Sequence, residues 1–67
     1  IIFSEVENKI ITLLSEGFKN KEIAVQTGLS ERQVRTCLTE IEKKMGAKDR
    51  THIVALAFKT GLLKSDE

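Results

Sequence analysis

The stretch from Ser30 to Met45 constrains the fold of this chain most, because its sequence predicts a helix with both ends defined. Ser30 followed three residues later by Gln33 is a capping-box pattern, which satisfies backbone N–H groups at a helix start. Gly46 follows the last periodic residue and suits the left-handed conformation that ends many helices. We therefore predict a helix over residues 31–45.

The two sides of this predicted helix differ in chemistry. At about 100° per residue, four apolar side chains fall on one narrow stripe, namely Val34, Leu38, Ile41 and Met45. The opposite side carries cationic groups and hydroxyls, from Arg32, Arg35, Thr36, Thr39 and Lys43, with Glu40 at its edge. Such groups suit the phosphates and base edges of a duplex, so we interpret the segment as a DNA recognition helix.

Length and composition limit the chain to one small domain. With 67 residues, no proline, no tryptophan or tyrosine and three phenylalanines, it suits a helical bundle better than a β-sandwich. A single cysteine excludes an internal disulfide framework, and we predict a cytoplasmic location without a membrane span. Because the chain opens on Ile1 without an initiator methionine, we expect residues 1–67 to be a C-terminal fragment of a longer protein.

The positive charge is concentrated in the middle of the chain. The net charge is only +1, which is weak evidence for a nucleic-acid partner. Residues 18–50, however, carry eight Lys and Arg against five acids, whereas residues 1–17 carry one Lys against three Glu. The excess therefore surrounds the predicted recognition helix, where a phosphate backbone would bind.

A first helix is predicted over residues 5–16, because Ser4-Glu-Val-Glu7 repeats the capping-box pattern. Its expected buried stripe, at helical spacing, comprises Val6, Ile10, Leu13 and Leu14. We expect Glu5 and Glu7 to favour the helix dipole and assign them no catalytic role.

A second, short helix is predicted over residues 21–27, with Asn20 as its expected cap. It leads through Gly28 and Leu29 directly into the helix at residues 31–45. Two helices joined by a three- or four-residue turn that contains Gly form the helix-turn-helix signature. A plain helical hairpin shows the same pattern, so the pattern alone leaves both interpretations open.

A fourth helix is predicted over residues 50–60, with Asp49 as its cap. Its apolar residues form two adjacent stripes, one of Ile53, Leu56, Ala57 and Thr60 and one of Val54 and Phe58. An exposed apolar strip often marks a partner surface, so the second stripe is the candidate for dimerisation. The alternative is that Phe3 or Leu62-Leu63 folds back and covers it, and residues 64–67 are expected to be a solvated tail.

The remaining residues offer little material for catalysis. One Cys and one His make neither a zinc site nor a nucleophile–base pair, and the four isolated glycines make no phosphate-binding loop. We therefore expect no enzyme activity, no metal and no cofactor. Cys37 is interpreted as a packing residue in preference to a redox sensor.

Six short segments, in this order and spacing, resemble the LuxR/GerE/NarL-type helix-turn-helix domain. They are Leu14-Ser-Glu-Gly17, Asn20-Lys-Glu-Ile-Ala24, Leu29-Ser-Glu31, Val34-Arg35, Lys43-Lys-Met-Gly46 and Asp49-Arg-Thr51. The resemblance covers essentially residues 3–63. It implies a four-helix fold whose third helix enters the DNA major groove and whose fourth helix pairs two copies. Family members are bacterial transcription factors, commonly with a receiver or a small-molecule-sensing domain before this one.

The resemblance also implies roles for individual residues. Facing the bases would be Arg35, Thr36 and Thr39, to which we add Arg32 from the same side of the helix. Contacting the DNA backbone would be Asn20, Lys21, Lys43 and Lys44. Arg35 suits a bidentate pair with guanine, whereas the threonines offer either hydroxyls or methyls. The family often has Pro-Arg-Glu where this chain has Glu5-Val6-Glu7, which leaves open the ion pair that such an Arg would make.

We thus predict sequence-specific binding of double-stranded DNA by the output domain of a bacterial transcriptional regulator. A homodimer through the fourth helix would bind two half-sites about one helical turn apart, and RNA polymerase is a further candidate partner. The alternative, from another class, is a helical protein-interaction module that uses Val54 and Phe58 without binding DNA.

Overall fold

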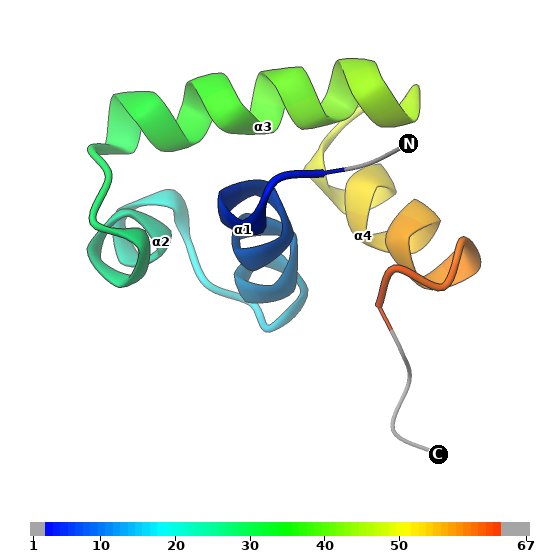
Figure 1. Ribbon diagram of the computed structural model, residues 1–67, viewed down its shortest axis with the longest axis horizontal. Coiled ribbons are helices and arrows are strands. Elements are labelled where there is room, and N and C mark those ends of the chain that lie inside the picture. The colour runs from blue at the N-terminus through cyan, green and yellow to red at the C-terminus, as the bar shows by residue number, and fades with distance from the viewer. Residues whose placement is uncertain (1–2, 64–67) are drawn as a thin grey trace.

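The computed structural model describes residues 3–63, which form four helices and no strand within that range. The helices are α1 (Glu5–Ser15), α2 (Asn20–Thr27), α3 (Glu31–Met45) and α4 (Arg50–Lys59). α3 runs along one side of the molecule, and the other three helices lie beneath it, with α2 under one end and α4 under the other (Figure 1). The predicted all-α four-helix fold is confirmed, whereas the predicted tail at residues 64–67 lies outside the described residues.

Polar caps fix the starts of α1 and α3 as predicted. Ser4 Oγ accepts the Glu7 N–H at 3.1 Å, and the Ser4 N–H donates to Glu7 Oε1 at 2.9 Å. The same reciprocal pair joins Ser30 and Gln33, at 3.1 and 2.9 Å. Gly46 ends α3 in the left-handed conformation with φ 70°. Since one capping residue stabilises a helix by about 1 kcal/mol, these contacts secure α3 at its first turn.

α2 begins one residue earlier than predicted, and the prediction that Asn20 caps it is wrong. Asn20 is the first helical residue, and Lys19 occupies the cap position in an extended conformation. The Lys19 N–H donates to Glu22 Oε1 at 2.8 Å, so the Glu22 carboxylate sets this boundary. Among the described residues, Asn20 Oδ1 is a buried side-chain oxygen without a hydrogen-bond partner.

α1 and α4 each end one residue before the predicted boundary, at Ser15 and Lys59. At the end of α1, the Glu16 N–H is shared between two carbonyls of the last turn, which tightens that turn and closes the helix. After α4, the chain folds back so that the Leu63 N–H donates to the Ala57 carbonyl at 3.0 Å.

All four helices contribute to a single core. Its buried hydrophobic residues are Ile10, Ile11, Leu13, Ile23, Ala24, Val34, Leu38, Ile41, Ile53 and Ala57. The predicted stripe of α1 holds for Ile10 and Leu13 but not for Val6, which is 44% exposed. Val6 lies in the first turn, where its neighbour Glu7 takes the inward position to reach Lys44. Leu14 is half-buried and packs against the core.

The connection between α2 and α3 is a tight turn at Gly28 and Leu29. Gly28 adopts φ 75°, which side-chain-bearing residues rarely tolerate, and the Leu29 N–H bonds to the Ala24 carbonyl at 3.1 Å. Ala24 is 7% exposed and small, so α2 can lie close against its neighbours. α2 therefore supports the first half of α3 from below.

Candidate nucleic-acid interface

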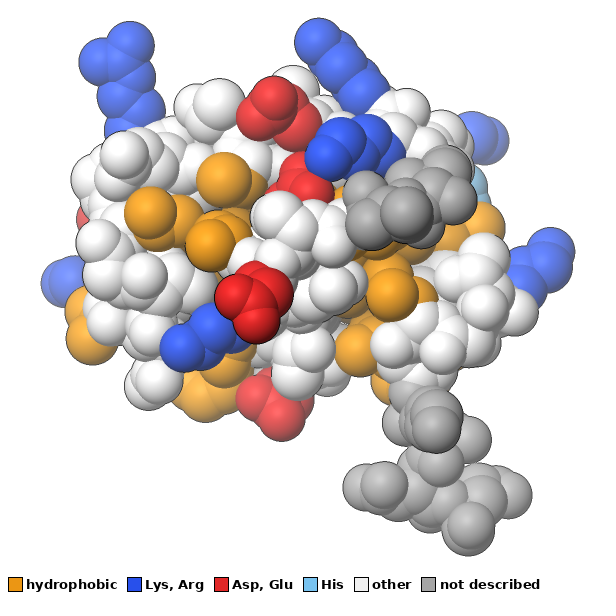
Figure 2. Space-filling model, in the orientation of Figure 1, with side chains coloured by type: hydrophobic (Ala, Val, Ile, Leu, Met, Phe, Trp, Pro, Cys, Tyr) orange, Lys and Arg blue, Asp and Glu red, His pale blue; other side chains and the backbone are white. Residues whose placement is uncertain are grey.

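The outer side of α3 is a continuous polar surface with the core directly behind it. The five polar residues predicted for it are all exposed, namely Arg32, Arg35, Thr36, Thr39 and Lys43. The inner side of the same helix is closed by Val34 and Ile41, both 0% exposed. In the space-filling view, Lys and Arg side chains project from the edge of the molecule that α3 forms (Figure 2). An α-helix with its side chains is about 10–12 Å across, close to the width of the B-DNA major groove.

Each threonine on this surface follows an arginine by one helical turn and bonds to its backbone. Thr36 Oγ1 donates to the Arg32 carbonyl at 3.1 Å, and Thr39 Oγ1 donates to the Arg35 carbonyl at 3.0 Å. Residues three and four apart on a helix are surface neighbours. The two arginines and two threonines therefore form one compact group on the exposed side of α3, and their contact with bases stays a prediction.

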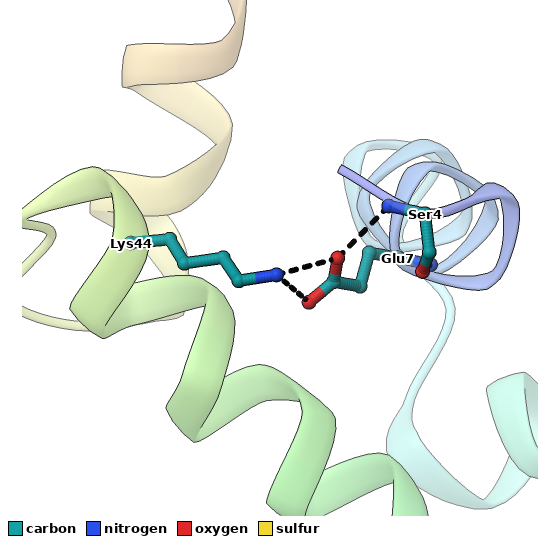
Figure 3. A network of polar contacts seen from close by, with 3 residues as sticks. All are labelled: Ser4, Glu7 and Lys44. Carbon is teal, nitrogen blue, oxygen red and sulfur yellow. Dashed lines mark hydrogen bonds and ion pairs between the residues drawn. The ribbon is translucent and has the colours of Figure 1, made fainter. Parts of the chain in front are cut away.

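An ion pair between α1 and α3 anchors the C-terminal half of α3 (Figure 3). Lys44 Nζ lies 2.9 Å from both carboxylate oxygens of Glu7, and it lies 5.6 Å from the centroid of the Phe3 ring. The Lys44 ammonium is the main reason that the pKa of Glu7 is lowered, followed by the Ser4 backbone N–H. Burial acts in the opposite direction and raises that pKa. Glu7 thus caps α1 and holds α3 with the same carboxylate.

This ion pair changes how two predicted residues are understood. The sequence predicts that Glu7 completes a capping box and favours the helix dipole, and the structure also pairs it with a residue 37 positions away. The capping-box pattern indicated the carboxylate, whereas no local signal in the sequence could indicate its distant partner. Lys43 and Lys44 are both exposed and both predicted to contact phosphate, but only the Lys44 ammonium is paired with Glu7.

The other two residues predicted to contact the DNA backbone lie in the first turn of α2. Lys21 is exposed and Asn20 is half-buried. The first turn of a helix presents free backbone N–H groups and the positive end of the helix dipole, which favour anions. The position suits a phosphate, and the contact itself stays a prediction.

Cys37 lies beside the inner stripe of α3. It is half-buried and packs against the core. Burial raises the pKa of its thiol, and the nearby Glu40 and Glu7 carboxylates raise it further. A raised pKa disfavours the reactive thiolate, so the geometry supports the interpretation of Cys37 as a packing residue.

The side of α4 that carries Val54 and Phe58 is apolar and incompletely covered. Val54 lines an open groove of about 520 Å³ between α4 and the end of α1, together with Leu14, Phe18 and Ala55. Phe58 is 44% exposed. Within residues 3–63, the alternative cover from Phe3 or Leu62-Leu63 leaves Phe58 partly exposed. Leu63 packs against the core instead, and a separate cavity of about 460 Å³ is lined by Phe3, Met45, Leu56, Thr60, Gly61 and Leu62.

Residues 3–63 contain neither a metal-binding cluster nor a membrane-spanning helix. No three or more His, Cys, Asp or Glu side chains in this range gather where a metal ion would be held. No helix in the same range has the length and apolar character needed to cross a membrane.

Comparisons with known proteins agree with the fold and identify the family. Residues 2–57 match the family described as "bacterial regulatory proteins, luxR family". The solved structure of the transcription factor GerE matches with a TM-score of 0.88 at 26% identity, over 96% of both chains. This chain is therefore a helix-turn-helix domain, and it belongs to the LuxR family of bacterial regulatory proteins. The resemblance noted in the sequence is confirmed.

Several curated relatives are similar over most of this chain. Transcriptional regulatory protein YdfI of Bacillus subtilis (strain 168) is 40% identical over 63 residues, which are 94% of this chain and 30% of YdfI. Response regulator Rre1 of Synechocystis is 37% identical over 60 residues, covering 90% of this chain and 26% of Rre1. Response regulator protein VraR of Staphylococcus aureus is 32% identical over 63 residues, which cover 94% of this chain and 30% of VraR. The chain thus spans less than a third of the length of these relatives.

Proposed function

We propose that this chain is the sequence-specific DNA-binding output domain of a bacterial transcriptional regulator. The observation that carries the proposal is the outer side of α3, where two arginines and two threonines form one exposed group above a closed core. Membership of the LuxR family and relatives named as transcriptional regulators support it. The proposed place of action is the bacterial cytoplasm, where the chromosome lies.

In the proposed complex, α3 enters the major groove and its residues divide between bases and backbone. Arg35 would donate two hydrogen bonds to guanine O6 and N7, a contact that discriminates by about 1–3 kcal/mol. Arg32 lies one turn before Thr36 on the same exposed side and would reach an adjacent base or phosphate. Lys43, Asn20 and Lys21 would contact phosphates, which fix register without selecting sequence.

The rest of the regulator would supply the signal. The relatives are more than three times as long as this chain, and two of them are named response regulators. A phosphorylatable receiver domain in the same protein is therefore proposed as the input. Contact with RNA polymerase would convert occupancy of the DNA into a change in transcription.

A homodimer through α4 is the proposed binding species. Phe58 is 44% exposed, and the open groove beside Val54 offers further apolar surface to a second copy. The domain measures 30 × 26 × 19 Å, so two copies can occupy half-sites about 34–36 Å apart. The same exposed apolar surface is what favours the second candidate, a protein-interaction module that binds no DNA.

Selection from a random duplex pool separates the two functions. We expect one enriched motif, and we expect Arg35→Ala to lower affinity for that motif by about 5- to 150-fold relative to a scrambled duplex. Lys9→Ala, which removes an exposed cation from α1, serves as the control and should leave the preference intact. No enriched motif, together with an Arg35→Ala variant that binds as the unaltered chain does, would exclude sequence-specific binding.

The dimer is tested on duplexes with one or two half-sites. Phe58→Glu places a charge in the apolar surface and should reduce affinity for paired half-sites while leaving single half-site binding unchanged. Leu62→Glu introduces the same charge at a residue 39% exposed in the other cavity, and it should affect neither duplex. Equal affinity of Phe58→Glu and the unaltered chain for paired half-sites would remove α4 as the interface.

A further inference from the structure

The hydrogen bonds of Thr36 and Thr39 limit what these side chains offer to a base. A carbonyl oxygen can only accept a hydrogen bond, so each hydroxyl donates its single proton to a backbone carbonyl of α3. The oxygen–oxygen distances are 3.1 Å for Thr36 and 3.0 Å for Thr39. Neither hydroxyl then has a proton for the acceptors of the major groove, which are guanine O6 and N7, adenine N7 and thymine O4. What remains is the γ-methyl group and the lone pairs of a bonded oxygen.

The γ-methyl is the group of each threonine that is free to meet a base. The oxygen is held against the preceding turn by its bond to the Arg32 or Arg35 carbonyl. The methyl takes another staggered position on Cβ and is not held in this way. Both residues are exposed, so no neighbouring side chain encloses them. In the major groove, the complementary apolar group is the C5-methyl of thymine.

We infer that Thr36 and Thr39 read thymines through their γ-methyl groups and do not act as hydrogen-bond donors. The inference rests on the proposed function, because it names the bases that the outer side of α3 selects. Residues three apart on a helix have Cβ atoms about 5–6 Å apart, and successive bases of one strand are about 3.4 Å apart along the duplex axis. The two thymines are therefore expected one or two base steps apart, next to the guanine contacted by Arg35.

A deoxyuridine scan of the selected duplex tests this inference, because deoxyuridine lacks only the C5-methyl of thymine. With the unaltered chain, single replacements at two thymines should each lower affinity by about fourfold, the value of one buried methyl. Thr39→Ser removes the γ-methyl and should abolish the effect at one of the two positions, whereas Thr39→Val should retain it. The same contrast is expected for Thr36→Ser and Thr36→Val at the other position.

Thr12 offers a matched control on a different helix. It is also exposed, and its Oγ1 makes the same kind of backbone bond, to the Asn8 carbonyl at 2.9 Å. Thr12→Ser and Thr12→Val should leave the deoxyuridine profile unchanged. Thermal unfolding of each variant checks that the fold is intact, since exposed substitutions usually change stability by less than about 0.5 kcal/mol.

The outcomes separate this inference from the function on which it depends. Selective binding without any sensitivity to deoxyuridine would overturn the methyl contacts and leave sequence-specific binding in place. Loss of preference in the Val variants with retention in the Ser variants would also overturn them, and would assign the base contact to each hydroxyl in place of its methyl. Absence of selective binding by the unaltered chain would overturn both proposals.

Discussion

The outer side of α3 and the Val54/Phe58 side of α4 are both uncovered, but the fold supports them differently. α3 has a closed inner side, a capping box at its start, a left-handed glycine at its end and an ion pair to α1. α4 has one polar cap, the Asp49 side chain that accepts the His52 N–H at 2.8 Å, and apolar residues spread over a wider arc. The first surface is polar and rigidly supported, and the second is apolar and only half-covered.

This difference in polarity indicates which kind of partner each surface can bind. A polar helix side is well hydrated, so its exposure to water in the absence of DNA destabilises the domain little. An apolar side chain such as Phe58 is stabilised only when another apolar surface removes it from water. This difference supports the proposals that α3 binds nucleic acid and that α4 binds a second protein surface.

Matched truncations in α4 test whether its two sides differ as described. Ile53→Ala should destabilise the domain by about 2–5 kcal/mol, because Ile53 is 0% exposed and its removal leaves a cavity. Phe58→Ala should cost less, about 1–2 kcal/mol in the monomer, because the ring is 44% exposed and only partly removed from water. Chemical denaturation measures both values. A Phe58→Ala loss as large as that of Ile53→Ala would show that Phe58 belongs to the core.

The ion pair that supports α3 is expected to have the next largest effect. Glu7→Gln should destabilise the domain by about 1–2 kcal/mol, between the values for exposed and buried pairs, because Glu7 is 9% exposed and the Lys44 side chain is 42% exposed. Glu5→Gln, at an exposed acid in the same turn, is the control and should cost only a few tenths of a kcal/mol.

The contribution of Glu7 should also depend on pH. Its pKa is lowered in the folded state, mainly by Lys44, so its stabilisation is present above the ordinary glutamate pKa of about 4.3. That stabilisation is lost as the pH falls below this value and through the lowered folded pKa. The difference in unfolding free energy between Glu7→Gln and the unaltered chain should therefore shrink on acidification. A difference that stayed constant from pH 7 to the acid range would argue against the ion pair.

The smallest effect is expected for single phosphate contacts, and it compares two adjacent lysines. Lys43→Ala should weaken binding to all duplexes alike and flatten the salt dependence of log affinity by about 0.9. Lys44→Ala should flatten it less and should lower stability instead, because the Lys44 ammonium is paired with Glu7. The reverse result, with the full change in slope at Lys44, would restore Lys44 as a phosphate contact.

The sequence predicted features that depend on near neighbours and missed those that depend on distant ones. Caps at Ser4, Ser30 and Asp49 and the polar side of α3 follow from spacing within one or two turns, and the structure contains them. The pairing of Glu7 with Lys44 joins two helices, so no periodicity indicates it. The start of α2 was misplaced because two polar residues compete for one boundary, and a backbone bond to Glu22 decides between them.

The candidate site shows the same division. Which residues of α3 face outward was predictable from helical spacing, whereas the state of the Thr36 and Thr39 hydroxyls was not. A threonine in a helix can bond to the preceding turn or present its hydroxyl outward, and only coordinates distinguish the two. The covering of Val54 and Phe58 likewise depends on where Phe3, Leu62 and Leu63 pack, which spacing alone leaves open.

An NMR titration compares the two surfaces most directly. Amide chemical shifts of the labelled domain are followed while a duplex that carries one half-site is added. We expect the largest changes between Arg32 and Lys43 of α3 and in the first turn of α2. Val54, Ala55 and Phe58 should change little, because a single half-site binds one copy. Large changes at Val54 and Phe58 with an unperturbed α3 would contradict the assignment of DNA to α3.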